Sequence, residues 1–320
     1  MAAETYEELL KQTAENNEQY VVMTAENRAL IRNLPAVLGS RFVDTGITEQ
    51  CLIGAAAGLA LRGRIPVVHA LASFLTMRAF EFVRTDVGIS GLPVKLTGFV
   101  PGFLSDGNGP THQAIEDVSL MRGIPGMQVY CPADNDDMLK MLPHIWSNNS
   151  PTYIRANTRP TSYSHAPYES GKAEVIARGK DVTILVYGML FEQALEARAL
   201  LMQEGLDVGF ANMRSLSPID EDYLINVSKS GSLLVTIEDH FLTGGLYSIL
   251  AETLLRNQLT ADVLPMALNH RWFKPGLLSE VLNYEGFTST QMAEKILNKL
   301  GRKTKQAFTS HIISENTFDE

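Results

Sequence analysis

The chain has few of the residues that mark secreted, metal-binding or nucleic-acid-binding proteins. Only two of its 320 residues are cysteines, Cys51 and Cys131, and neither lies in a CxxC pair or beside a histidine cluster. This excludes a disulfide framework and gives no sign of a zinc site. The formal net charge is −9, and no run of lysine and arginine is long enough to follow a phosphate backbone. Nucleic acid is therefore not an expected partner.

Long apolar runs are also missing. The first ten residues, MAAETYEELL, lack the basic segment followed by an apolar one that is typical of a secretion signal. The longest apolar region, residues 51–77, is interrupted by Arg62 and Arg64, so we do not expect it to cross a membrane. Both cysteines are expected to be buried and reduced, which makes the cytoplasm the expected location.

The composition is that of a folded protein, with 45% hydrophobic and 20% charged residues. A length of 320 residues predicts two domains. Short β-branched runs alternate with helical periods, which indicates α/β domains with mostly parallel sheets flanked by helices. Expected strands are 20–25, 41–46, 65–71, 92–99, 127–132 and 151–156, then 181–188, 207–213, 232–239 and 261–268. Expected helices include 48–62, 192–204, 221–229, 245–256 and 289–300.

A change of composition divides the two series. Residues 157–172, NTRPTSYSHAPYESGK, are rich in serine, proline, threonine and tyrosine and have no apolar period. We therefore predict a first domain over residues 1–160, a linker over 161–178, a second domain over 179–305 and a mobile tail over 306–320.

Two segments of the first domain carry candidate functional residues. FVDTGITEQCLIGAAAGLAL places Glu49 in the first turn of an apolar helix, where it is either an exposed partner of the helix dipole or a functional acid in a hydrophobic setting. GNGPTHQAIED places His112 on a turn beyond an expected strand, at the edge where parallel sheets collect ligands. His112 is either a structural histidine or a substrate contact.

Taken together, these segments resemble the pyrimidine-binding domain of transketolase and its relative 1-deoxyxylulose-5-phosphate synthase. GITEQ is similar to the family's Gly-Ile-Arg-Glu-His, and GPTHQ matches its Gly-Pro-Thr-His-Gln. SLLVTIEDHFLTGGL resembles the corresponding region of the family's C-terminal domain. The resemblance covers about residues 15 to 300, and it makes the second domain an expected transketolase C-terminal domain.

The resemblance implies a catalytic role for Glu49. The matching family glutamate hydrogen-bonds the aminopyrimidine of thiamine diphosphate and promotes its imino tautomer, which removes a proton from the thiazolium ring. This chemistry needs a carboxyl group with raised proton affinity, and we expect the alanine-rich helix to supply an apolar pocket. The bound cofactor acts as an electron sink for a two-carbon fragment.

Further cofactor contacts follow from the resemblance. Ile47 matches an apolar residue placed against the cofactor, and Glu26 lies near a family acid that faces it across a subunit interface. Phe74, with Phe80 nearby, resembles the aromatic wall that stacks on the aminopyrimidine. An alternative alignment matches Arg78 to an arginine of the synthase, and its other interpretation is a solvated helix face.

Substrate contacts are implied in the same way. His112 matches a histidine that contacts oxygen atoms of the ketose donor, and Asn108 occupies the position of an aspartate that recognises a sugar hydroxyl. A second substrate histidine is replaced near Val100, which departs from ordinary transketolases. Arg155 and Arg159 both lie near a phosphate-binding arginine of the family. A further histidine, His240, matches a position with a structural role.

One family feature is missing from the chain. The family holds Mg²⁺ and the cofactor's pyrophosphate with a Gly-Asp-Gly segment, and no GDG occurs in this sequence. The resemblance therefore implies an N-terminal transketolase subunit as partner, with two such pairs forming an α2β2 assembly that acts on sugar phosphates. Alternatives are a transketolase for a specialised sugar, a subunit like the synthase or the β subunit of a 2-oxo acid dehydrogenase, and a regulatory homologue without activity.

Overall fold

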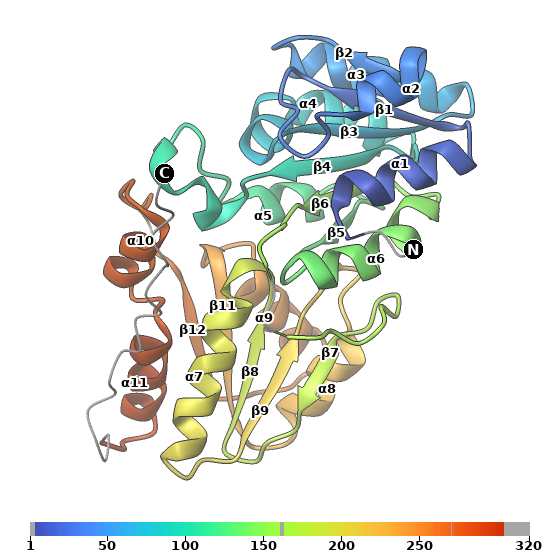
Figure 1. Cartoon of the computed structure of the whole chain (residues 1–320). Coiled ribbons are helices and arrows are strands. Elements are labelled where there is room, and N and C mark those ends of the chain that lie inside the picture. The colour runs from blue at the N-terminus through green and yellow to red at the C-terminus, as the bar shows by residue number, and fades with distance from the viewer. Residues whose placement is uncertain (1–3, 161–162, 270, 304–320) are drawn as a thin grey trace.

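The computed structural model describes residues 4–160, 163–269 and 271–303, and it contains two sheets, each covered by helices (Figure 1). The prediction of two α/β domains is confirmed. No helix in these ranges is long and apolar enough to cross a membrane. The predicted tail, residues 306–320, lies outside the described residues.

The first sheet has seven strands in the order β10-β5-β6-β4-β3-β1-β2, of which all but β10 are parallel to their neighbours. Its parallel strands are β1 Tyr20–Thr24, β2 Phe42–Asp44, β3 Ile65–Leu71, β4 Lys95–Phe99, β5 Gln128–Tyr130 and β6 Thr152–Arg155. Its helices are α1 Tyr6–Asn16, α2 Leu34–Leu38, α3 Glu49–Leu61, α4 Phe80–Phe82, α5 Asp117–Arg122 and α6 Asn135–Ser147. Shorter turns are the 3₁₀-helices Gly39–Arg41 and Gly102–Asn108 and the π-helices Phe74–Arg78 and Val83–Gly88.

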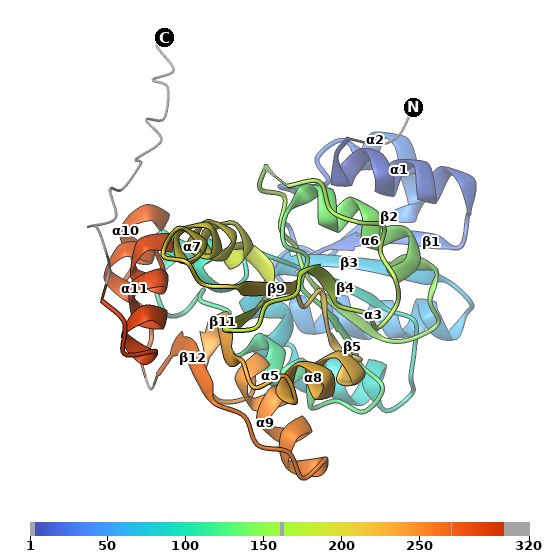
Figure 2. The same cartoon turned by 90° about the horizontal axis from the view of Figure 1, so that it is seen from below.

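The second sheet has the order β12-β11-β8-β9-β7, with β7 antiparallel at one edge. Its strands are β7 Glu174–Ala177, β8 Val182–Val186, β9 Val208–Asn212, β11 Leu233–Phe241 and β12 Val263–Leu268. The helices are α7 Phe191–Gln203, α8 Glu221–Ser228, α9 Leu246–Arg256, α10 Leu278–Glu285 and α11 Ser289–Lys299, with a 3₁₀-turn at Gly188–Leu190. Figure 2 shows α7, α10 and α11 on one face of this sheet and α8 and α9 on the other.

Burial explains the strand sequences. Every residue of β1, β4, β8 and β9 is buried, as expected of parallel strands with helices on both faces. The face of the first sheet under α3 and α5 and the face of the second under α8 and α9 share one hydrophobic cluster. The two domains are therefore docked through a common core.

The predicted linker is more structured than its composition indicates. It contains β7, and His165 within it is buried. The chain then returns from the second domain to the first, because β10 Ser215–Ser217 pairs with β5 and extends the first sheet. Polar composition predicted a loop here because it does not report the hydrogen bonds and ion pairs that other segments supply.

His165 lies in a buried cluster of charged side chains between the domains. Its Nδ1 is 2.7 Å from a Glu174 oxygen, and its Nε2 is 3.0 Å from a carboxylate oxygen of Asp134. Arg214 lies 2.8 Å from Asp137 and 2.9 Å from Glu174. The ligand atoms of Asp137, His165 and Glu174 lie within 4.8 Å of one another, but cations of the chain already pair with these carboxylates. The cluster therefore joins first domain, linker and second domain electrostatically.

This surrounding changes the proton affinity of His165. Burial by itself would lower its pKa, but the hydrogen bonds to Asp134 and Glu174 act in the opposite direction and raise the pKa to about 9. A folded-state pKa above the unfolded value means that protonated His165 stabilises the fold.

We predict that His165 makes stability depend on pH in the alkaline range. Its contribution is fully present below the unfolded pKa, about 6.5, and is lost as the pH rises through its folded value of about 9. Urea denaturation from pH 6 to 10 should show wild type losing more stability than His165→Asn. Parallel curves for the two proteins would contradict the role assigned to His165.

Candidate active site

A hollow of about 320 Å³ lies at the edge of the first sheet where β1, β2 and β3 end. These strands are neighbours and run parallel, so their carboxyl ends meet at the edge where α/β sheets bind ligands. The lining residues are Ala25, Glu26, Asn27, Ile47, Glu49, Ala70, Leu71 and Phe74. Four residues predicted from three separate segments, Glu26, Ile47, Glu49 and Phe74, are thus brought together.

Glu49 is the first residue of α3 and is only 2% exposed. Its two carboxylate oxygens each accept a hydrogen bond from Nη1 of Arg78 at 3.2 Å. The Arg78 guanidinium also lies over the Phe74 ring, 3.8 Å from its centroid. The expected burial of Glu49 is present, and most residues that line the hollow are apolar, but Arg78 also places a cation on the carboxylate.

Phe74 and Arg78 are the first and last residues of a π-helix. A π-helical turn contains an extra residue, and such turns are frequent at functional sites. Residues four positions apart lie on the same side of a helix, and here the Arg78 guanidinium lies over the Phe74 ring. No period in the sequence predicts this turn, and the alignment of Arg78 was left open.

His112 joins the site through an aromatic contact. Its ring lies 5.1 Å from the Phe74 ring, centroid to centroid, with an angle of 60° between the planes. The Thr111 hydroxyl is 2.9 Å from His112 Nδ1 and so orients the imidazole. The GITEQ and GPTHQ segments, about sixty residues apart in the sequence, therefore meet at Phe74.

Asp44, at the end of β2, is a residue of this site that sequence reasoning missed. Its carboxylate accepts hydrogen bonds from the backbone N–H groups of Glu26 and Gly46, both at 3.0 Å, and pairs with Arg28. Burial would raise the pKa of Asp44, but the hydrogen bonds from Arg28 and these N–H groups outweigh it and lower the pKa. Asp44 thus fixes the two loops that deliver Glu26 and Ile47, and its place at a strand end was the signal available.

The backbone at this edge is strained. Glu26 has φ +69° and Val100, which follows β4, has φ +46°, a left-handed region that non-glycine residues rarely adopt. Such conformations cost about 1–3 kcal/mol each and concentrate at functional sites.

Comparison with known proteins agrees with this geometry. The transketolase pyrimidine-binding domain family matches residues 2–161, and the transketolase C-terminal domain family matches residues 171–292. The chain belongs to the transketolase family. This family is generally thiamine diphosphate dependent.

Individual relatives agree on the family and differ in activity. The 6-deoxy-6-sulfo-D-fructose transketolase subunit of Clostridium sp. (strain MSTE9) is 35% identical over 79% of this chain and 80% of that protein. The 1-deoxy-D-xylulose-5-phosphate synthase of Dictyoglomus thermophilum is 33% identical over 81% of this chain but 43% of the synthase. A solved structure described as a split gene transketolase, inactive beta4 tetramer, has a TM-score of 0.84 and 32% identity, covering 94% of this chain and 98% of that one.

The arginines predicted to bind phosphate lie in different surroundings in this transketolase-family chain. Arg155 is 2% exposed, and its guanidinium lies 2.9 Å from Asp117 and 2.7 Å from Asp239. Because these carboxylates already occupy it, the geometry does not support Arg155 as a phosphate ligand. Arg159 is half-buried and lines a small recess beside Tyr163.

The remaining predicted residues lie around the site in different ways. Asn108 is exposed at the end of the 3₁₀-helix Gly102–Asn108. Phe80 is half-buried and packs on the shared core, and it is not among the residues that line the hollow. His240 is buried, and its Nε2 accepts a hydrogen bond from the Ser119 N–H.

The second domain braces the loop that carries His112. The Gln113 side chain donates a hydrogen bond to the Phe273 carbonyl at 2.8 Å, and Phe103 packs edge-on against Phe273. The Phe103 N–H donates to Asp239 at 3.2 Å. Gly102 is required here, because an added Cβ would lie 1.8 Å from an Asp239 oxygen.

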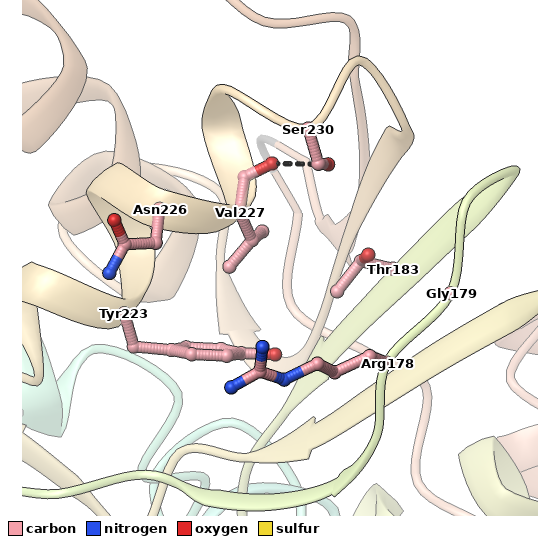
Figure 3. Close-up of a pocket in the computed structure, with 7 residues that line it drawn as sticks. All are labelled: Arg178, Gly179, Thr183, Tyr223, Asn226, Val227 and Ser230. Atoms are coloured by element: carbon pink, nitrogen blue, oxygen red, sulfur yellow. Dashed lines mark hydrogen bonds between the residues drawn. The ribbon is translucent and has the colours of Figure 1, made fainter.

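A second hollow, of about 310 Å³, lies in the second domain (Figure 3). It is lined by Arg178, Gly179, Thr183, Tyr223, Asn226, Val227 and Ser230. Burial raises the pKa of Tyr223 to about 12, partly offset by the charge of Arg178. None of the predicted site residues lines this hollow, so the candidate site remains the one at Glu49.

We predict that Arg155→Met destabilises the fold by about 3–5 kcal/mol, because it leaves Asp117 and Asp239 buried without their cation. Urea denaturation at pH 7 measures this loss. Arg159→Met is the matched control and should change stability by less than about 0.5 kcal/mol, because its side chain is partly exposed and forms no ion pair with the residues that the structure describes. Equal effects of the two substitutions would contradict the structural role of Arg155.

Proposed function

We propose that this chain is the β subunit of a two-component thiamine diphosphate-dependent transketolase. In this proposal it transfers a two-carbon ketol unit from a ketose, or its phosphate, to an aldose. The observation that carries the proposal is the buried carboxylate of Glu49 in a hollow that also contains Phe74 and borders His112.

The residues of the hollow fit the aminopyrimidine half of the cofactor. Glu49 offers a carboxylate, Phe74 offers an aromatic face for stacking and Ile47 offers an apolar side chain. When bound, the cofactor supplies an electron sink for the two-carbon fragment. Glu49 holds a proton at its carboxylate toward the pyrimidine ring, and His112, oriented by Thr111, contacts oxygen atoms of the donor.

A partner completes the site in this proposal. Ile47 is 66% exposed and Glu26 is exposed, so the hollow is open on the side of these residues. The chain has no GDG segment for Mg²⁺ and pyrophosphate. We infer that an N-terminal transketolase subunit supplies these groups and covers the open side, in an α2β2 assembly.

A second candidate is the reaction of 1-deoxyxylulose-5-phosphate synthase. The similarity to that enzyme and the position of Arg78 beside Glu49 favour it. Because one relative is named for a sulfonated ketose, sulfonated sugars belong among the donors to be tested. A synthase consumes pyruvate and releases CO₂, whereas ketol transfer does neither, so the two reactions are distinguishable.

Reconstitution tests the proposed function. The chain is purified alone and with an N-terminal transketolase half, and each preparation is assayed with thiamine diphosphate, Mg²⁺ and a panel of sugar phosphates, sulfosugars and pyruvate. Ketol transfer by the mixture alone supports the proposal. An inert mixture across the panel contradicts it.

Within the active mixture, Glu49→Gln should lower kcat by about 100-fold or more, because proton transfer by a positioned acid contributes on that scale. Folding should be spared, since the amide keeps the shape of the carboxylate, and circular dichroism checks this. Glu81→Gln, at an exposed position, is the control and should keep wild-type turnover. Wild-type kcat in Glu49→Gln would remove the assigned role.

His112→Ala should raise the KM of the donor by roughly 5–50-fold, the effect of losing a hydrogen bond at a polar contact. Cofactor affinity should change little, because Glu49 and Phe74 remain. Initial rates against donor and cofactor concentration separate the two effects, with the exposed His144→Ala as control. An unchanged donor KM would mean that His112 does not contact the donor.

A further inference from the structure

Arg78 makes two contacts that bear on how the hollow is used. In the described residues, it provides the only side-chain hydrogen bonds to the Glu49 carboxylate. A buried carboxylate is costly without such a partner. Glu49 is 2% exposed, so Arg78 satisfies a group that would otherwise be buried and unpaired.

The second contact covers the aromatic face beside Glu49. The Arg78 guanidinium lies 3.8 Å from the centroid of the Phe74 ring, which is the geometry of a cation–π pair. A planar guanidinium thus donates to a carboxylate and stacks on a phenyl ring at once. A flat aminopyrimidine would make the same two contacts.

Arg78 is placed so that its side chain can leave Glu49 and Phe74. The Arg78 side chain is 41% exposed, so its guanidinium reaches solvent although the Glu49 side chain is buried. By contrast, the buried Arg155 is held by Asp117 and Asp239 together. Arg78 can therefore leave Glu49 when another hydrogen-bond donor takes its place on the carboxylate, whereas Arg155 is held by two buried acids.

We propose that Arg78 is an internal competitor for the aminopyrimidine position, which pairs with Glu49 and covers Phe74 until the cofactor displaces it. The inference rests on the proposed function, because it assigns Glu49 and Phe74 to the cofactor. Nη1 of Arg78 lies on both oxygens of Glu49 while its guanidinium covers the Phe74 ring, so a flat pyrimidine ring that needs the same carboxylate and the same ring face competes with it.

The experiment uses the reconstituted complex and measures thiamine diphosphate binding with Mg²⁺ by calorimetry. Arg78→Met removes both contacts, so we expect the Kd of the cofactor to fall by about 5–10-fold, the scale of one weak ion pair and one cation–π contact together. The cofactor-free complex should melt at a lower temperature than wild type, because Glu49 loses its partner. Arg78→Lys keeps the charge, so its cofactor Kd and melting temperature should lie between those of wild type and Arg78→Met.

Two controls separate this role from a structural one. Arg84→Met removes an exposed arginine of the next π-helical turn, Val83–Gly88, and should leave both the Kd and the melting temperature unchanged. In a Glu49→Gln background, Arg78→Met should change the Kd less, because the ion pair is already absent.

The outcomes distinguish the inference from the proposed function. An unchanged or higher Kd in both Arg78 variants, beside normal binding by wild type, overturns the competition and leaves the proposed function standing. Failure of the wild-type complex to bind the cofactor overturns both. A lower cofactor Kd in Arg78→Met, together with a lower melting temperature of its cofactor-free complex, supports the inference.

Discussion

The arrangement of the chain depends on one buried cation. Arg155, at the end of β6, pairs with Asp117 at the start of α5 and with Asp239 in β11, so a single guanidinium joins both sheets. Charged groups buried this deeply are tolerated only as a complete set, because removing one leaves the others without compensation. The carboxylate of Asp239 also accepts a hydrogen bond from the Phe103 N–H. It lies so close to Gly102 that a Cβ there would clash with it. The loop that leads to His112 therefore begins at this ion pair, and the position of the loop depends on the docking of the two domains.

This dependence gives the second domain a function although it contributes no residue to the lining of the hollow. Gln113 is hydrogen-bonded to the Phe273 carbonyl, directly next to His112 in the sequence. The shared hydrophobic cluster under α3, α5, α8 and α9 keeps the domains from moving as separate bodies. A histidine on an exposed loop would otherwise sample many positions, and its ring would not stay 5.1 Å from Phe74. The second domain thus orders a residue of a site that is built on the first.

The sequence predicted the fold well because the buried parallel strands are continuous apolar runs, which stand out from the helices between them. It missed β7 and β10, which are antiparallel edge strands of only three or four residues, too short for an apolar period to stand out. In the site, the motif resemblance pointed to Glu49 and His112. Both follow strands of the parallel sheet, whose carboxyl ends lie at the same edge, and this brings the two segments together. The sequence left open what contacts decide. It could not choose between Arg155 and Arg159 as the phosphate contact, and the structure pairs Arg155 with two acids. It also left the alignment of Arg78 open, and the structure places Arg78 on Glu49.

The strained backbone at the site is held in place by the buried strands of the first sheet. Glu26 and Val100, which follow β1 and β4, adopt left-handed backbone angles that non-glycine residues rarely adopt and that are least favourable for a β-branched residue such as Val100. They persist because the strands before them are fully buried and leave the chain no freedom to relax. Asp44 adds to this by holding the Glu26 N–H. A buried sheet and one carboxylate therefore keep the rim of the hollow in a fixed, open shape, with Ile47 exposed beside it. An open, rigid and partly apolar rim is the form required of a surface that a second protein completes, and this is the physical reason for placing the proposed partner there.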